Sequence, residues 1–427
     1  MPTASKYQSW KSLNDETLMS VIDLVNKQEK AQQEEAYMKF KDLFDDVKNF
    51  IIDKRLVLYG GTALNEILPE KYKFYPKQLL PDYDFFSHNA KSHAQELADI
   101  LNKKGYNYIE VKPGLHHGTY KVYAEFLPVA DITQIDKDIY ENLVDHSDMN
   151  LKNEQSDFQL IVSPYPFLKW SLYLELSKIG STHRWQKLFP RYVAVNHVYK
   201  FDQPRESKHP LKMDSPLLNT VTSLFKTFIK TRKYPVVGSF GMNLHMGLPY
   251  KDEYNPFTAF EIMTTDLNKT LEELKITYKV IKGIQLYLVW PKKPFSTFMA
   301  NRCTVMAKIK GEGEIGLCKL YEVTDVCYCV KHIKGFVVGT VDAILQYMYA
   351  SYMKSEILQT DYSKEKLLYL SKEILILETF IDTKIKHKSK RLSLECYGKE
   401  KSLLDIRKEQ WGQKQFFYRP KAKSTKK

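Results

Sequence analysis

The sequence predicts an α/β protein, of the α+β kind, built from two similar modules. Over residues 51–205 short apolar runs alternate with helical periodicities, which is typical of a small sheet covered by helices. One apolar run ends in Gly60-Gly61, and an Asp-x-Asp follows at Asp82 and Asp84. Because the pattern around the paired glycines recurs later in the chain, we expect the same fold twice.

Residues 1–50 are expected to form a helical region ahead of the first module. Large apolar residues recur at helical spacing between about 15 and 54, which predicts two helices, the second leading into a strand at Leu56–Tyr59. The elements expected next are a helix at 61–68, a strand at 83–87, a helix at about 89–104 ended by Gly105, strands near 106–112, 118–126 and 129–133 with a hairpin-like turn at Pro113-Gly114, and helices from 167 to about 199.

The second module follows a boundary rich in proline and charge at Asp202–Pro216. When the two halves are aligned without a gap, three matches stand out: Lys54-Arg55 with Arg232-Lys233, Gly60-Gly61 with Gly238-Ser239, and Asn65 with Asn243. The second half has no Asp-x-Asp after its glycine, only scattered acids such as Glu261 and Asp266. We infer a duplication in which the second half kept the fold and lost the acids; chance matching of two amphipathic helices is the alternative.

Four regions are therefore expected. They are a helical region at 1–50, a first and chemically active module at 51–205, a degenerate copy at 206–395, and a basic tail at 396–427. After Glu409 no acid appears, and aromatic residues alternate with basic ones. We expect the tail to be flexible and solvated, with RNA contact as the alternative.

Charge and composition limit the class of protein. The net charge of +13 and the pI near 9.1 favour a polyanionic partner, without separating RNA from DNA or lipid. No segment is typical of a signal peptide and no apolar run reaches about 18 residues, so no membrane partner is expected. The five cysteines lie late in the chain and lack CxxC pairs, which predicts a reduced intracellular protein without a zinc site.

The candidate catalytic residues are three aspartates. Alternate side chains of a strand share a face, so Asp82 and Asp84 are expected to point to the same side. Asp131 lies in the apolar run Pro128–Thr133, where an acid is costly unless it binds something; the alternative is an acid that caps the next turn. Carboxylates grouped in this way bind hard divalent cations, which phosphoryl transfer needs.

Phosphate binding is expected at the glycines. Gly60 and Gly61 allow backbone N–H groups to approach an anion at the start of a helix, and the Thr62 hydroxyl could hold the β- and γ-phosphates with them. Asp82, Asp84 and Asp131 are then expected to hold two Mg²⁺ or Mn²⁺ ions, which orient the triphosphate and activate a primer 3′-hydroxyl.

Other polar residues are weaker candidates for cofactor binding. Lys121 lies on a strand before Asp131, and Lys169, Arg184 and Lys187 lie on the helices after the sheet. Each could bind triphosphate or RNA backbone, and each could equally be a solvated surface charge. Asn65 is expected to brace the elbow, that is, the turn from strand to helix at Gly60-Gly61, with nucleotide contact as the minor alternative. His116 and His117 are neighbours that point apart on a strand, which favours a structural role.

These motifs resemble those of the DNA polymerase beta-like nucleotidyltransferase superfamily. Twenty residues separate Gly61 from Asp82, more than is usual in cellular members. The insertion Pro69–Pro81, the DYDFFS that follows it, and the later HHGTYKVY and VADIT resemble the poly(A) polymerase catalytic subunits of large cytoplasmic DNA viruses, namely poxviruses, asfarviruses and giant amoebal viruses. The similarity is specific over about residues 54–135.

The resemblance implies a nucleotidyltransferase fold with a second, degenerate nucleotidyltransferase-like domain. It implies ATP as donor, an RNA 3′ end as acceptor, and activity in the virion and the host cytoplasm. The poxvirus members imply a viral processivity subunit as partner, and the giant-virus members imply a homodimer. Adenine preference rests on the resemblance, since no base pocket is evident in the sequence.

Two alternatives remain open at this stage. The same fold could transfer uridylate, extend tRNA ends, or modify a small molecule, although the charge of +13 favours a long nucleic acid. A catalytically inactive scaffold that binds nucleic acid is the other alternative, and the three aspartates of the first module argue against it.

Overall fold

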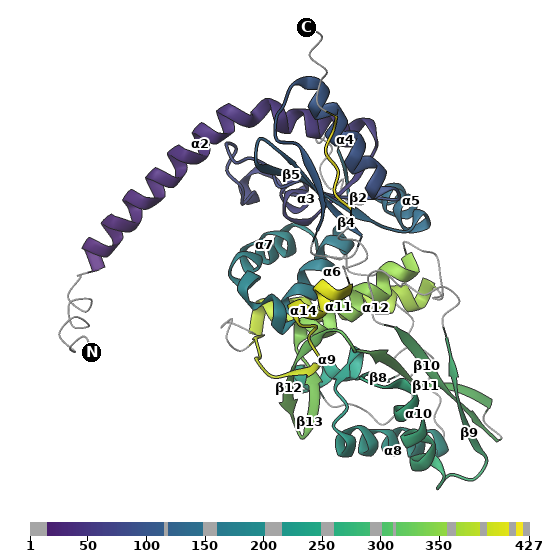
Figure 1. Cartoon of the computed structure of the whole chain (residues 1–427). Coiled ribbons are helices and arrows are strands. Elements are labelled where there is room, and N and C mark those ends of the chain that lie inside the picture. The colour runs from purple at the N-terminus through teal and green to yellow at the C-terminus, as the bar shows by residue number, and fades with distance from the viewer. Residues whose placement is uncertain are drawn as a thin grey trace, which may run out of the picture.

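The computed structural model describes residues 15–114, 118–147, 160–200, 216–248, 260–290, 301–310, 313–356, 364–384, 391–409 and 416–421. Two α/β modules make up the body of the protein, one above the other in Figure 1. Helices from both halves lie between the two sheets, and there α6 (Tyr165–Leu176) packs against α11 (Val341–Glu356).

The first module contains a six-stranded sheet in the order β3-β4-β5-β2-β1-β6. Strands β1 and β2 are antiparallel, and β2 is parallel to β5. Its elements are α2 (Asp15–Asp53), β1 (Val57–Tyr59), α3 (Gly60–Ile67), η2 (Glu70–Tyr72), β2 (Asp84–Ser87), α4 (Ala90–Lys104), β3 (Glu110–Pro113), β4 (Thr119–Ala124), β5 (Leu127–Gln134), α5 (Lys137–Asp145), β6 (Ile161–Val162), α6, η4 (Ile179–Arg184) and α7 (Trp185–Val198).

The second module repeats the central part of this topology. Its eight-stranded sheet has the order β14-β12-β13-β7-β8-β11-β10-β9, so β9-β10-β11-β8-β7 corresponds to β3-β4-β5-β2-β1 with the same strand directions. Its elements are α8 (Pro216–Arg232), β7 (Val236–Val237), α9 (Gly238–Met246), β8 (Phe260–Thr264), α10 (Leu267–Tyr278), β9 (Ile284–Val289), β10 (Arg302–Ile309), β11 (Gly313–Glu322), β12 (Cys327–Ile333), β13 (Phe336–Gly339), α11, α12 (Lys364–Lys384), β14 (Cys396–Gly398) and α14 (Leu403–Glu409).

The strand-to-helix elbow is the most conserved feature between the two modules. Gly60 has φ +77° and Gly238 has φ +63°, so both glycines lie in the left-handed region where a side chain is strained. Five positions before each of these glycines, Arg55 and Lys233 also have positive φ. This correspondence supports the duplication inferred from the sequence and argues against chance matching.

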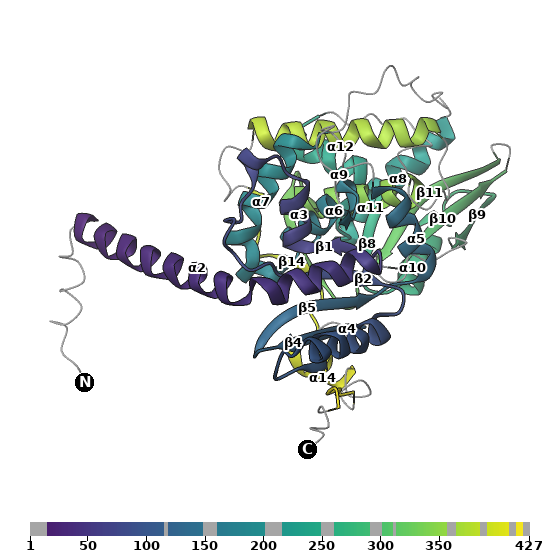
Figure 2. The same ribbon diagram turned by 90° about the horizontal axis from the view of Figure 1, so that it is seen from above.

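The N-terminal region differs from its prediction. One helix, α2, runs without interruption from Asp15 to Asp53 where two helices were expected. No glycine or proline interrupts this stretch, and its polar middle consists of Gln, Glu, Lys and Ala, which are strong helix formers. The helix reaches the body only near Leu43, and its earlier part extends away from both modules (Figures 1 and 2).

The C-terminal region also differs from its prediction as a free tail. Residues 396–398 form β14, which pairs with β12, and Tyr418 forms an antiparallel bridge with Val111 of the first sheet. Figure 1 shows this last segment as a narrow yellow ribbon that runs beside α4 and β4. Apolar and aromatic residues within the basic sequence make these contacts. The charge pattern alone predicted a free tail, because it does not reflect these residues.

The state of the cysteines differs from its prediction. Cys327 and Cys396 form a disulfide between β12 and β14, which contradicts the expectation that all five cysteines are reduced. The partners are 69 residues apart, so their spacing gave no indication of the pair. Among the described helices, none has both the length and the apolar composition that crossing a membrane requires.

A buried ion pair joins the two halves. Lys169 on α6 is 1% exposed, and its Nζ donates to the carbonyl of Tyr199 at 2.9 Å and to Glu378 on α12 at 2.9 Å. The hydroxyls of Tyr173 and Tyr349 donate to the other oxygen of the same carboxylate. The prediction that Lys169 binds triphosphate or RNA is therefore not supported, because its ammonium is enclosed by protein partners.

Replacement of Lys169 by Met should destabilise the protein by roughly 3–5 kcal/mol, since Glu378 would keep a buried charge without its main partner. Denaturant unfolding followed by circular dichroism measures this loss, with the exposed Lys187→Met as the matched control. The double variant Lys169→Met/Glu378→Gln should recover part of the loss. Equal stability of the Lys169 and Lys187 variants would contradict a buried tie between the halves.

Candidate nucleotidyl-transfer site

The three predicted aspartates lie next to one another at one end of the first sheet. Asp84 begins β2 and is the register partner of Asp131 on the parallel strand β5. Asp82 precedes Asp84 by two residues, while the side chain of Tyr83 between them is buried. The backbone N–H of Asp131 donates to the carbonyl of Tyr83 at 2.9 Å. The alternation predicted from the Asp-x-Asp is therefore present.

The glycine elbow touches this acidic group. Tyr59 is the register partner of Asp84, and the chain turns into α3 immediately after it. A Cβ atom placed on Gly60 would collide with Oδ2 of Asp84. Glycine is therefore required at position 60 both by its positive φ and by the close carboxylate.

Crowding makes the ionised form of Asp84 unfavourable. Burial, together with the charges of Asp82 and Asp131, raises the pKa of Asp84 to about 8, although Lys121 and Arg184 partly oppose this. Burial and then the charge of Asp84 raise the pKa of Tyr59 as well. Three carboxylates are thus held together with too little positive charge to balance them.

Lys121 supplies part of that positive charge. It is the register partner of Asp131 across β4 and β5, and its Nζ lies 2.5 Å from the Asp131 carboxylate. Burial lowers the pKa of Lys121, but the hydrogen bond and the attraction to Asp131 outweigh it, so the pKa is raised overall. Lys121 is therefore a partner of the acidic group, not a free phosphate-binding lysine.

The acidic group has donors of the kind that bind a divalent cation, but it is not arranged as a ready metal site. Within the described residues, no three His, Cys, Asp or Glu side chains are placed to hold a metal ion. The chemistry of the donors fits, since clustered carboxylates whose ionisation is unfavourable are stabilised by a hard cation. Asp131, however, faces Lys121, so its carboxylate would have to exchange this partner for a cation.

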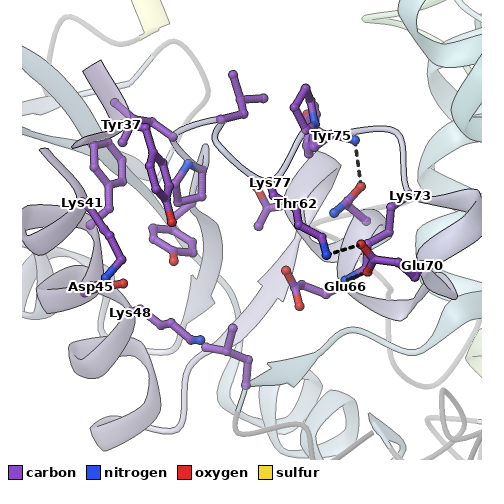
Figure 3. Close-up of a pocket in the computed structure, with 18 residues that line it drawn as sticks. Tyr37, Lys41, Asp45, Lys48, Thr62, Glu66, Glu70, Lys73, Tyr75 and Lys77 are labelled. Carbon is purple, nitrogen blue, oxygen red and sulfur yellow. Dashed lines mark hydrogen bonds and ion pairs between the residues drawn. The ribbon is translucent and has the colours of Figure 1, made fainter. Parts of the chain in front are cut away.

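Thr62 and Asn65 make contacts within the protein that support the site. The Thr62 hydroxyl donates to the carbonyl of Asp82 at 2.6 Å, which fixes the start of the Asp-x-Asp to α3. Oδ1 of Asn65 accepts from the backbone N–H groups of Phe74 and Tyr75, each at 3.0 Å (Figure 3, dashed line at Tyr75). Asn65 therefore braces the insertion against the elbow, as its main prediction stated.

Arg191 and Tyr75 are site residues that the sequence did not reveal. A Cβ atom on Gly61 would meet the Tyr75 hydroxyl and lie 2.9 Å from Nη1 of Arg191, so both side chains cover the elbow. Arg191 donates to the Tyr75 hydroxyl, and its guanidinium lies 5.1 Å from the ring centre of Phe74. Burial raises the pKa of Tyr75, Arg191 opposes this, and Asp82 and Asp84 add to it.

Lys187 and Arg191 are four positions apart on α7 and therefore share a helix face. Arg184 ends η4 directly before this helix. Arg184 donates to Glu175 at 2.7 Å, and its charge lowers the pKa of Asp84. Lys187 is exposed. This spacing could have suggested Arg191 from the sequence. His116 and His117 lie outside the described residues.

A separate cavity of about 270 Å³ lies on the other side of Thr62 and Asn65, between α2 and the insertion. Figure 3 shows Lys41, Asp45 and Lys48 of α2 facing Lys73 and Lys77 of the insertion across it. Its charges are largely paired: Lys41 lies 3.3 Å from Asp45, and Lys73 and Lys77 lie 3.5 Å and 3.1 Å from Glu70. We therefore do not place the triphosphate here.

The corresponding place in the second module is closed by an internal ion pair. Glu261 occupies the position of Asp84, since it pairs with Val237 before the second elbow and would collide with a Cβ on Gly238. Its neighbour on the parallel strand is Lys319, where the first module has Asp131. Lys319 pairs with Glu261, and the Tyr321 hydroxyl donates to it at 2.9 Å. A lysine thus supplies the positive charge in this copy.

The first module has the nucleotidyltransferase fold predicted from the sequence. The sheet order, the elbow at the start of α3 and the acids on β2 and β5 agree with the fold class predicted from the sequence. A solved structure, the Megavirus polyadenylate synthase, has the same fold with a TM-score of 0.73 and 20% identity, over 96% of this chain and 86% of that one.

Residues 45–178 match the family described as poly(A) polymerase catalytic subunit. The chain is 36% identical over 131 residues to a protein of African swine fever virus named as a poly(A) polymerase catalytic subunit, which is 30% of this chain and 28% of that protein. It is 32% identical over 139 residues to the protein of the same name from Acanthamoeba polyphaga mimivirus, 30% of this chain and 24% of that protein. The resemblance to viral poly(A) polymerase catalytic subunits is confirmed.

These matches span less than a third of the curated relatives' length. The family match at residues 45–178 includes Gly60, Asp82, Asp84 and Asp131, while Arg184 and Arg191 lie beyond it. The second module lies outside it.

The stability of the Asp84→Asn variant should depend on pH. With a pKa of about 8 when folded and about 3.9 when unfolded, Asp84 keeps a proton in the folded state that the unfolded chain has lost, so wild-type stability falls as pH rises between these values. Asn cannot ionise. The variant should therefore equal the wild type near pH 4 and exceed its stability increasingly up to pH about 8.

Denaturant unfolding without divalent cations, at several pH values, measures this difference. Asp53→Asn, at an exposed aspartate that ends α2, is the matched control. A stability difference for Asp84→Asn that stays constant across the range would contradict the proposed crowding.

Proposed function

We propose that the protein is a template-independent polynucleotide adenylyltransferase that adds AMP from ATP to RNA 3′ ends. The observation that carries this proposal is the group formed by Asp82, Asp84 and Asp131 against the glycine elbow, inside the segment that matches the poly(A) polymerase family. In the reaction, the 3′-oxygen of the RNA bonds to the α-phosphorus of ATP, and the bond to the β-phosphate breaks to release pyrophosphate.

Divalent cations are part of the proposal. Asp82, Asp84 and Asp131 would hold two Mg²⁺ or Mn²⁺ ions, which when bound neutralise charge on the triphosphate and lower the pKa of the acceptor hydroxyl. In the protein without cations, Lys121 on the neighbouring strand holds Asp131 in place. The Thr62 hydroxyl fixes the backbone of Asp82, so the acids are positioned by contacts that need no ligand.

The triphosphate would lie over Gly61, at the N-terminus of α3. Backbone N–H groups and the helix dipole favour an anion there. Nη1 of Arg191 lies 2.9 Å from the place that a Cβ atom of Gly61 would occupy. Without a ligand, the Arg191 guanidinium donates to the Tyr75 hydroxyl. Its guanidinium can exchange that neutral oxygen for phosphate oxygens, which bind it more strongly.

The acceptor would be a long nucleic acid, as the charge of +13 favours. The relatives are proteins of viruses, so the proposed place of action is inside an infected cell, in the virion or the host cytoplasm. A second copy of the chain or a viral processivity subunit would be the protein partner. Adenine as the base is the least directly supported part.

A catalytically inactive RNA-binding protein is the second candidate function. It is favoured by the pairing of Asp131 with Lys121 and by the absence, among described residues, of three side chains placed to hold a metal. The two functions differ in one measurable property, the extension of RNA.

Labelled oligonucleotide RNA, incubated with each NTP in turn and Mg²⁺ or Mn²⁺, should be extended with ATP. The double variant Asp82→Ala/Asp84→Ala should lose this activity by at least about a thousandfold, because charge stabilisation at the transferred phosphate supplies most of the rate enhancement. Extension mainly with UTP or CTP would change the proposed base. No extension with any NTP would favour the inactive protein.

Arg191→Ala should raise the KM for ATP about tenfold or more, the value expected for a charge-assisted hydrogen bond to phosphate. Arg191→Lys should recover part of the affinity. Initial rates at varied ATP concentration measure both effects, with Arg232→Ala, an exposed arginine of the second module, as the matched control. An unchanged KM in Arg191→Ala would place the triphosphate elsewhere.

A further inference from the structure

Two aromatic side chains form an exposed stack at the far edge of the first module. Tyr108 is 61% exposed and Phe126 is 73% exposed. Their ring centres lie 3.9 Å apart with 27° between the ring planes, so they stack on each other while most of their surface faces solvent. Large aromatic side chains exposed as a contiguous pair are unusual in a protein that does not bind something there.

The backbone holds this stack in place. Tyr108 lies in the turn before β3 and Phe126 in the turn between β4 and β5, and both have positive φ, +53° and +63°. The two turns are tied together by Asn107 and Glu125: the Glu125 N–H donates to the Asn107 carbonyl at 2.9 Å, and the Asn107 N–H donates to the Glu125 carboxylate at 2.6 Å. The aromatic pair is therefore preorganised.

A cavity of about 810 Å³ lies beside the stack and carries cations. Tyr108, Phe126, Lys112 and Arg419 are among the residues that line it. Lys112 Nζ lies 5.3 Å from the ring centre of Tyr123, and the Arg419 guanidinium lies 4.9 Å from that of Phe417. Glu110 pairs with both cations, so the two cations share one carboxylate.

The last described segment of the chain completes this surface. Tyr418 exchanges two backbone hydrogen bonds with Val111, at 2.9 and 3.1 Å, and its hydroxyl donates to Asp99 at 2.6 Å. These contacts bring Phe417 and Arg419 to the edge of the first sheet, beside β3 (Figure 1). The basic C-terminal region thus contributes to the catalytic module.

The stack lies on the same hairpin as the candidate catalytic residues. Lys121 and Asp131 face each other across β4 and β5, and Phe126 is at the turn that joins these strands. Asp131 follows Phe126 by five positions, which corresponds to about 16 Å along an extended strand. A nucleic acid whose 3′ end lies at Asp131 can therefore reach the stack within a few nucleotides.

We propose that Tyr108, Phe126, Lys112 and Arg419, here called the aromatic platform, bind unpaired bases of the acceptor RNA upstream of its 3′ end. Exposed rings with cations beside them are the usual combination for single-stranded nucleic acid, because bases stack on the rings and the backbone meets the cations. A second copy of this chain fits less well, since it carries the same net charge of +13. The inference rests on the proposed function for its acceptor.

Fluorescence anisotropy with labelled single-stranded oligoadenylate of about 16 nucleotides, without ATP or metal, tests the platform. Tyr108→Ala/Phe126→Ala should weaken binding at least about tenfold, the loss expected from one or two stacked bases. Tyr108→Phe keeps the ring and should bind like the wild type. Ile276→Ala/Val280→Ala, at an exposed apolar pair of the second module, is the matched control.

A second measurement separates RNA binding from a merely structural role. Primers of about 2 nucleotides are too short to cover the platform and the site together, so their extension should be unchanged in the double variant, while extension of the longer primer falls. Unchanged RNA affinity, or equal losses with both primers, would overturn the proposal. A change of oligomeric state in light scattering with unchanged RNA affinity would overturn it too, in favour of an interface between copies.

If no primer is extended by the wild type, the proposed function fails, yet the binding measurement still decides on the platform. Loss of RNA affinity in Tyr108→Ala/Phe126→Ala would then support an RNA surface on an inactive protein.

Discussion

The structure depends on one unfavourable contact: three carboxylates crowded beside a glycine elbow. Asp84 touches the position where Gly60 would carry a side chain, and Asp82 and Asp131 add negative charge around it. Such a group of buried carboxylates destabilises a protein unless it binds something. The fold keeps it in place through the register of β1, β2 and β5, and Lys121 offsets part of the charge. A bound divalent cation would neutralise the negative charge that Lys121 leaves unbalanced.

The second module shows how the same geometry can exist without a cation. Its elbow, strand order and acid at Glu261 are retained, but Lys319 replaces the third carboxylate and pairs with Glu261. Burial raises the pKa of Glu261, yet Lys319 and Tyr321 outweigh it and the pKa is lowered. The electrostatic requirement is therefore met within the chain. Because the second copy has Lys319 in place of the third acid and Ala259 two residues before Glu261, only the first copy is expected to bind nucleotide with metal.

Local patterns predicted the parts of the molecule that local chemistry controls. The paired glycines, the Asp-x-Asp and the apolar runs gave the elbow, β2 and the sheet, because strand alternation and positive φ leave a direct trace in the sequence. Contacts between distant segments have no such local sequence pattern. The pairing of Lys169 with Glu378, of Cys327 with Cys396, and of Val111 with Tyr418 depends on how the modules pack. The contact of Arg191 with Tyr75 is of the same kind, although the four-residue spacing of Lys187 and Arg191 is visible in the sequence.

The most direct test of the account is the position of bound cations in crystals soaked with Mn²⁺ and a non-hydrolysable ATP analogue. Anomalous scattering locates manganese without assumption. The account predicts manganese beside Asp82, Asp84 and Asp131, with Lys121 released from Asp131, and none beside Glu261. Manganese at the second elbow, or nucleotide bound with no manganese near the three aspartates, would contradict it.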